Sequence, residues 1–252
     1  MPGGRACGGE WLVGGASQRH AVPVPGPTRV CSRCRQRLTP SVRFLKIGEV
    51  SSGGKTVTQP TVKTANLSDE AHVTAVLALA FSTDPGARWT WPNPQHYLSH
   101  FSSFVKAFAG RAFTHGSAHY VDGFAGAALW LPPGVYPDEE ALDALLQRSA
   151  SEQTQKDLFA VFEQMRHYHP SEPHWYLPLI GVDPFHQGKG LGHVLMQHAL
   201  MACDRDKKAA FLESTNPRNV TLYERHGFEV LGTIQVGTSP TLFPMLRKPR
   251  CQ

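Results

Sequence analysis

The sequence predicts an α/β domain over residues 58–250, with a central sheet flanked by helices. Three observations support this prediction. Strand-like apolar runs are interspersed with segments of helical spacing through most of this range. Asp122-Gly123 separates two strand-like runs and is the strongest hairpin signal in the chain. A glycine-rich turn at residues 188–192 joins an apolar run to an amphipathic segment, which indicates a strand, a tight turn and a helix.

The first 57 residues are rich in Gly, Pro and Arg, lack a sustained period, and are predicted to be a disordered basic leader. Residues 1–55 hold nine Lys/Arg and two acids, whereas residues 56–252 hold 16 and 18. The net charge of +5 therefore belongs to the leader, and the slightly acidic domain argues against a nucleic-acid partner. The Cys31-x-x-Cys34 pair lacks a second ligand pair, so we expect no metal site.

The cellular location is predicted to be cytoplasmic. Five cysteines, an odd number, fit a reducing compartment, and no apolar run reaches the roughly 20 residues that span a bilayer. We therefore expect no membrane partner. The Arg-rich leader makes mitochondrial import the minority alternative. The oligomeric state is left open.

The first half of the domain begins with a strand at residues 56–65, and capping residues at 66–70 precede a helix. Asp84-Pro85-Gly86 is interpreted as the end of that helix. An aromatic cluster then spans a loop and a second helix, and we expect one or two of its rings to face a substrate. The hairpin follows, with antiparallel strands at residues 115–120 and 124–131.

Two helical patterns at residues 138–168 form an insertion before the central strand, residues 174–182. Pro178 cannot donate to a sheet ladder, so it marks a local break or an edge in that strand. A helix from Leu191 follows the glycine turn. The remaining elements are a strand at residues 209–215, a helix starting at residues 216–219, and strands at residues 228–236 and 241–246.

The histidines of this half are predicted to be structural or to lie at a pocket mouth. His167, His169 and His174 lack the spacing of a familiar metal site, so they are interpreted as loop histidines. His198 lies on the apolar face of its helix and is interpreted as a packed core residue.

The glycine turn itself predicts an anion site, because three glycines in five residues permit sharp turns and close approach of a ligand to helix N–H groups. Gly188-Lys189 is followed by glycine rather than Ser or Thr, which excludes a Walker loop. The G-x-G-x-G spacing excludes the dinucleotide fingerprint. What remains is the pattern Q-x-x-G-x-G.

This pattern resembles the acetyl-CoA pyrophosphate loop of the GNAT N-acetyltransferase superfamily. Other motifs resemble puromycin N-acetyltransferase and its relatives within it: Glu172-Pro173-His174-Trp175, Gly181-Val182, Phe211-Leu212-Glu213, Pro217-Arg218-Asn219, Tyr223-Glu224-Arg225 and Gly227-Phe228. The resemblance covers residues 58–248. It implies a mixed, mostly antiparallel central sheet flanked by helices, to which this sequence adds the two-helix insertion before the central strand.

The resemblance also implies acetyl-CoA as co-substrate and a set of residues that hold it. The central strand is expected to splay from its neighbour and leave backbone groups free for pantetheine. Lys189 is expected either to touch phosphate or to face water. The expected cofactor-binding residues are Leu179, Ile180, Gly181, Val182, Gln187, Gly188, Lys189, Gly190, Leu191, Gly192, Asn216 and Asn219.

Two residues are candidate catalysts. Tyr223 lies seven residues after Asn216, as in the family's pattern, and its phenol can protonate the departing thiolate. Glu213 is the candidate general base, acting through a water molecule. Its alternative is a structural carboxylate paired with Arg218 or Arg225.

The predicted function is acetyl-CoA-dependent transfer of an acetyl group to the amine of a small molecule, either antibiotic-like or a metabolite. Two alternatives stay open: a non-catalytic acyl-CoA-binding protein, and a protein or peptide N-acetyltransferase that docks through the leader. The sequence does not define the acceptor amine.

Overall fold

The computed structural model describes residues 60–250. The predicted leader, residues 1–57 with the Cys31–Cys34 pair, lies outside the described residues, as does the first part of the strand predicted at residues 56–65. The structural description that follows concerns residues 60–250 alone.

The centre of the fold is a seven-stranded sheet in the order β1-β2-β3-β4-β5-β7-β6. Only the β4–β5 pair is parallel, and the other neighbouring pairs are antiparallel. The predicted mixed, mostly antiparallel sheet is therefore confirmed. The strands are β1 Val62–Thr64, β2 Ala118–Val121, β3 Gly126–Leu131, β4 Trp175–Val182, β5 Ala210–Ser214, β6 Glu229–Val230 and β7 Phe243–Arg247.

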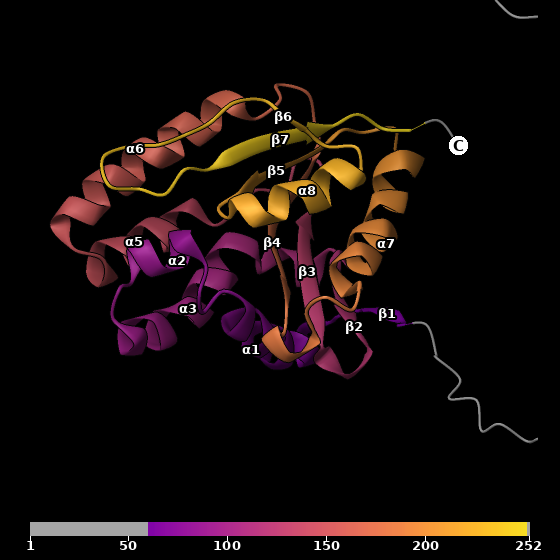
Figure 1. The fold of residues 1–252 in the computed structure, drawn as a ribbon, viewed down its shortest axis with the longest axis horizontal. Helices are drawn as coiled ribbons and strands as arrows, with labels where there is room; N and C mark the ends of the chain where they lie inside the picture. Colours follow the sequence, from indigo (N-terminus) through magenta and orange to yellow (C-terminus); the bar gives the residue numbers. More distant parts are fainter. Residues whose placement is uncertain (1–59, 251–252) are drawn as a thin grey trace, which may run out of the picture. The chain divides into compact units, whose positions relative to one another are not determined.

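Helices cover both faces of this sheet (Figure 1). Helix α7 packs against β1 to β4, whereas α1 and α3 pack against β3 and β4. The α-helices are α1 Glu70–Ala80, α2 Pro85–Thr90, α3 Pro94–Ala109, α4 Arg111–Thr114, α5 Glu139–Ser149, α6 Glu152–Tyr168, α7 Leu191–Arg205 and α8 Pro217–Arg225. Helices α5 and α6 are the predicted insertion before the central strand β4.

Strand β3 shows why two apolar cores form. Its six residues are all buried, and successive side chains point to opposite faces of the sheet. Ala127 and Leu129 join the core beneath α1, α3, α5 and α6. Ala128 and Trp130 join the core beneath α7 and α8. A strand covered on both faces reads as a continuous apolar run, as this one does.

Short polar side chains begin several helices. Asn66 forms a capping box with Asp69 ahead of α1, and Asn93 accepts from two amides at the start of α3. Asp84 caps α2, with Pro85 in the first turn. The interpretation of Asp84-Pro85-Gly86 as a helix end followed by a loop was therefore incomplete, because the same three residues also begin a short helix.

Strand β4 separates from β5 as predicted. Its pairing with β5 is confined to Trp175 and Tyr176, whereas its pairing with β3 continues to Val182. The β3–β4 register shifts between Leu129 and Leu131, opposite the segment that contains Pro178. Proline has no N–H to donate to the ladder, and an irregularity is where the sheet can accommodate this missing hydrogen bond. The separation leaves an opening between β4 and β5.

The hairpin and the last two strands are present but shorter than predicted. Strands β2 and β3 are antiparallel and are joined by the turn Asp122–Phe124, in which Gly123 has φ of 77°. Strand β6 has two residues, and beyond it a single bridge joins Ile234 to Leu242. The β6–β7 loop, residues 231–242, runs along α6 (Figure 1).

Among the described residues, no helix is long and apolar enough to cross a membrane.

Candidate active site

A pocket of about 680 Å³ occupies the opening between β4 and β5 and extends beneath α2, α3 and α6. All the predicted site residues except Lys189 line it. Segments far apart in the sequence therefore meet here: the end of α1, the glycine turn, the ends of β4 and β5, and α8.

The glycine turn forms one end of the pocket. Gly188 and Gly190 have φ of 75° and 80°, a left-handed conformation that glycine adopts without steric strain. Gly190 is the N-cap of α7 and provides no capping side chain. The first backbone bond here is donated by Val194 to Gly190, so the preceding amides of the helix have no intrahelical acceptor. This end of the pocket is therefore suited to an anionic group.

Two long side chains brace the turn rather than extend it. Nε2 of Gln187 donates to the carbonyl of Val182 at 3.2 Å, which ties the turn to the end of β4. Nζ of Lys189 donates to the carbonyl of Phe185 at 3.1 Å, and Lys189 does not line the pocket. Of the two roles expected for Lys189, facing water is the one this position favours.

Gly181 lines the pocket and also has a packing role that the sequence did not reveal. A Cβ on Gly181 would lie 2.5 Å from Cβ of Ala80 and 3.2 Å from Cδ2 of Leu77. Helix α1 can therefore approach β4 only because residue 181 has no side chain. Gly192 differs, since a Cβ there would meet Cδ2 of Leu222 at an ordinary 3.4 Å.

Helix α8 adds polar and cationic groups to the same end. Oδ1 of Asn216 accepts from the amide of Arg218 at 3.1 Å and so caps the helix. Asn219 lies one turn further and lines the pocket, as do Arg218 and Arg225. The glycine turn and α8 thus give this end donors and positive charge.

Tyr223 lines the pocket and is 5% exposed. Burial raises its pKa, and the negative charge of Asp84 raises it further. Both effects disfavour the phenolate, so the hydroxyl holds its proton at neutral pH.

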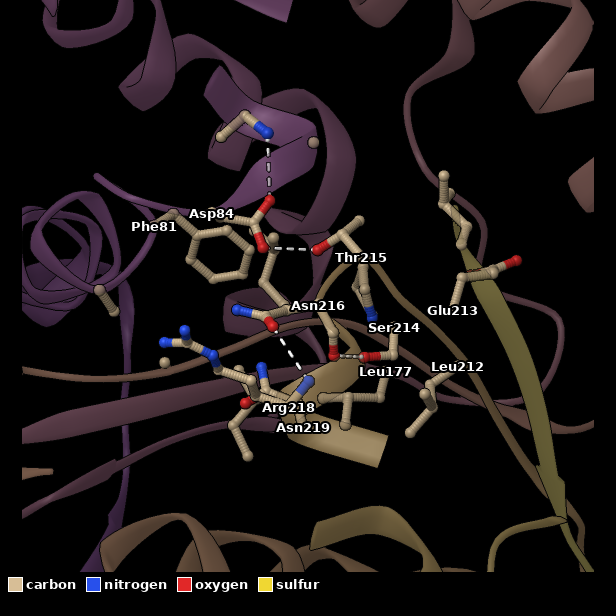
Figure 2. Close-up of a pocket in the computed structure, with 18 of the residues that line it drawn as sticks. Phe81, Asp84, Leu177, Leu212, Glu213, Ser214, Thr215, Asn216, Arg218 and Asn219 are labelled. Carbon is tan, nitrogen blue, oxygen red and sulfur yellow. Dashed lines mark hydrogen bonds between the residues drawn. The ribbon is translucent and has the colours of Figure 1, made fainter. Parts of the chain in front are cut away.

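Asp84 is a site residue that the sequence interpretation missed. It is 8% exposed and lines the pocket. Its carboxylate accepts from Oγ1 of Thr215 at 2.6 Å and from the amide of Ala87 at 3.1 Å (Figure 2). Burial raises the pKa of this carboxyl, and the hydrogen bonds oppose that shift. A cap residue beside aromatic residues gave no signal of a pocket, because the partner Thr215 is 131 positions away.

Glu213 also lines the pocket, but its side chain points away from Asp84 and Thr215 (Figure 2). The side chain is 3% exposed, and Oε1 lies 3.2 Å from Nε2 of His169 without an aligned hydrogen bond. The suggested pairing of Glu213 with Arg218 or Arg225 is not formed, because the side chain faces the end of α6 instead.

The other end of the pocket, under α2, α3 and α6, is apolar and aromatic. The β6–β7 loop closes this side: Nε1 of Trp89 donates to Oγ1 of Thr238 at 3.0 Å, and the amide of Thr238 lies 3.4 Å from Oδ2 of Asp157 on α6. The apolar lining residues are Phe81, Trp89, Trp91, Phe101, Phe104, Phe108, Leu146, Leu158, Val161, Phe162, Met165 and Leu242.

These features define a class of protein in which one pocket joins a helix start suited to an anionic group with an apolar, aromatic end. Residues 154–228, from α6 to the end of α8, match the model of the acetyltransferase (GNAT) family. An uncharacterised N-acetyltransferase of Schizosaccharomyces pombe (strain 972 / ATCC 24843) is 25% identical over 207 residues, which are 75% of this chain and 84% of that relative.

Solved structures share the fold. The histone acetyltransferase HPA2 and related acetyltransferase from Corynebacterium glutamicum ATCC 13032 has a TM-score of 0.55 at 24% identity, over 77% of this chain and 98% of its own. Arylalkylamine N-acetyltransferase 2 of Aedes aegypti has a TM-score of 0.54 at 14% identity, over 76% and 99%. The polyamine N-acetyltransferase of Drosophila melanogaster has a TM-score of 0.53 at 14% identity, over 75% and 100%.

The family match and the shared fold place this chain among the GNAT acetyltransferases. It is an acetyltransferase, and the predicted fold class is confirmed. The family generally uses acetyl-CoA. The roles of individual site residues stay predictions.

Proposed function

We propose that this protein is an acetyl-CoA-dependent N-acetyltransferase that acts on the amine of a small molecule. The observation that carries this proposal is a single pocket with two chemically different ends, which Tyr223 also lines. One end offers unpaired amides and arginines, and the other offers apolar rings; the carboxylates of Asp84 and Glu213 also line the pocket.

The first end fits the polyanionic part of acetyl-CoA. The amides at the start of α7 have no intrahelical acceptor, and the left-handed glycines leave the backbone accessible. Arg218 and Arg225 add positive charge. The free edge of β4 beyond Tyr176 offers backbone groups to the pantetheine chain. When bound, acetyl-CoA supplies the acetyl group as a thioester.

The second end fits an amine with a bulky apolar or aromatic body. Its rings bury apolar surface, and the carboxylate of Glu213, which also lines the pocket, attracts an ammonium group. On one side of this end, the β6–β7 loop is held to α2 by the Trp89–Thr238 hydrogen bond. A loop held over the pocket in this way favours a small molecule over a protein acceptor.

Three chemical tasks can be assigned to residues of this chain. Glu213 accepts a proton from the ammonium group, so that the amine can act as a nucleophile. Asp84 lines the same pocket on the side of Thr215 and adds negative charge that favours a cationic substrate. Tyr223, which stays protonated because it is buried, donates its hydroxyl proton to the departing thiolate.

The test is to incubate the purified full chain with acetyl-CoA and a panel of amines, and to follow free thiol and product mass. The panel includes phenethylamine, agmatine and a lysine-containing peptide. We expect acetylation of phenethylamine-like amines in preference to agmatine or the peptide. Calorimetric binding of CoA without thiol release from any amine would instead indicate a non-catalytic acyl-CoA-binding protein. Acetylation of the peptide alone would support the protein or peptide alternative.

A further inference from the structure

Two histidines connect the buried carboxylate of Glu213 to the surface. His169, directly after α6, has Nε2 at 3.2 Å from Oε1 of Glu213. Its Nδ1 lies 3.2 Å from Nε2 of His174. Nδ1 of His174 lies 2.8 Å from the carbonyl oxygen of Glu172. The chain of contacts thus runs from the pocket through two imidazole rings to an exposed segment before β4.

The carbonyl at the outer end fixes where the hydrogens lie. A carbonyl oxygen only accepts, so Nδ1 of His174 carries a hydrogen, and Nε2 of neutral His174 is an acceptor. His169 must then donate from Nδ1. A neutral His169 is left with a bare Nε2 facing a carboxylate oxygen. The two atoms are 3.2 Å apart without an aligned hydrogen bond, so a rotation of the imidazole ring would allow a proton to lie between them.

We propose that His169 and His174 relay to solvent the proton that Glu213 takes from the substrate ammonium group. This inference rests on the proposed function. An N–H bond of the ammonium breaks and an O–H bond forms at Glu213. That proton moves to Nε2 of His169 while the Nδ1 proton of His169 moves to Nε2 of His174. His174, which is partly exposed, then releases one proton to water.

The surroundings of this chain suit a mobile proton. Glu213 is 3% exposed and His169 is 29% exposed by side chain, so the chain leads from a dry site to a wet one. Tyr176 on β4 is the other titratable group next to Glu213, and burial raises the pKa of its phenol well above the ordinary value. On β7, the residue opposite Glu213 is Pro244, which carries no charge.

The test compares His169→Gln with His167→Gln. Glutamine keeps an N–H donor near Glu213 but cannot carry a proton. His167 lies two residues earlier, is exposed, and contacts the carbonyl of Glu163 rather than Glu213, so it is a matched control. Each variant is assayed with an accepted amine and with its β,β-difluoro analogue, whose fluorines lower the ammonium pKa and barely change its shape.

We expect His169→Gln to lower kcat for the parent amine by about 10-fold or more and to alter its pH profile. The same variant should change kcat for the fluorinated amine by less than about 2-fold, because that amine arrives already deprotonated. His167→Gln should leave both rates unchanged. The KM for acetyl-CoA should not change in either variant.

An equal loss with both amines would show a structural role for His169 and overturn the relay. An unchanged rate with the parent amine would overturn it as well. If His169→Gln does not fold, the partly exposed His174→Gln carries the same comparison. A wild-type protein that releases no thiol with any amine would instead contradict the proposed function itself, which separates the two failures.

Discussion

The carboxylate of Asp84, at the start of α2, accepts a 2.6 Å hydrogen bond from the hydroxyl of Thr215, directly after β5. This contact joins the segment after α1 to the strand end that precedes α8, and both residues line the pocket. A buried carboxylate held in this way is a site of charge in an otherwise apolar region. Its hydrogen bonds fix its orientation, but they do not remove the effect of burial on its pKa.

Replacing Asp84 with asparagine should raise stability and lower activity. Burial raises the pKa of Asp84, so the native state binds a proton more tightly than the unfolded chain does. Stability therefore falls as pH rises from the unfolded pKa to the raised folded one, and it stays lower at neutral pH. Asparagine removes that loss and can still accept from the amide of Ala87 while its NH₂ group faces the Thr215 hydroxyl.

The measurement is urea unfolding of wild type and Asp84→Asn at pH 7 and at pH 4, together with amine kinetics. The stability gain should be larger at pH 7 than at pH 4, and KM for the amine should rise. Thr215→Val serves as a control that removes the hydroxyl but keeps the charge. A variant that is less stable at pH 7 would contradict this account of the carboxylate.

Replacing Tyr223 with phenylalanine should reduce kcat by about 100-fold or more, since general acid catalysis typically contributes that much. The ring is 5% exposed and packs edge-on against Phe228, so phenylalanine should preserve the packing. The binding of CoA should be unchanged. Tyr136→Phe is the matched control, because Tyr136 is 63% exposed and lies outside the pocket. Full activity of Tyr223→Phe would remove Tyr223 from the mechanism.

The last two glycines of the turn should respond differently to alanine. Gly190 has φ of 80°, a conformation that costs an alanine about 1–2 kcal/mol. Gly190→Ala should therefore lower the free energy of unfolding and weaken CoA binding. Gly192 lies within α7 with room for a Cβ, so Gly192→Ala should change stability by less than about 1 kcal/mol. Thermal unfolding and calorimetric CoA titration of both variants measure these effects. Equal effects of Gly190→Ala and Gly192→Ala would contradict the special role of the left-handed conformation at Gly190.

Most of the fold could be predicted because its signals are local. The Asp122-Gly123 hairpin, the helical spacing of α5 to α7 and the glycine turn are each encoded within a few residues. Element lengths were less predictable. Strand β6 has two residues where nine were expected, because its continuation follows α6 rather than the sheet edge.

The site was predictable where a motif is contiguous and unpredictable where a contact is long-range. The three glycines of the turn, Asn216 and Tyr223 all line one pocket, and their roles there stay predictions. Asp84 was missed because its partner Thr215 is distant in the chain. The suggested pairing of Glu213 with an arginine was wrong for the same reason. Arginines nearby in the sequence suggested a salt bridge, but the fold brings the end of α6 against β5.

The contact between Gly181 and Ala80 yields a prediction that tests packing apart from chemistry. Gly181→Ala places a Cβ 2.5 Å from that of Ala80, so α1 must shift, which should cost about 1–3 kcal/mol of unfolding free energy. Ala80→Gly alone should also destabilise, by up to about 1 kcal/mol, because glycine is a poor helix former. The double variant should be more stable than the sum of the two losses predicts, because Ala80→Gly makes room for the new Cβ. Urea unfolding of the four proteins gives the coupling energy, which we expect to exceed about 0.5 kcal/mol. Additive losses would mean that the close approach of α1 to β4 is not what requires glycine at this position.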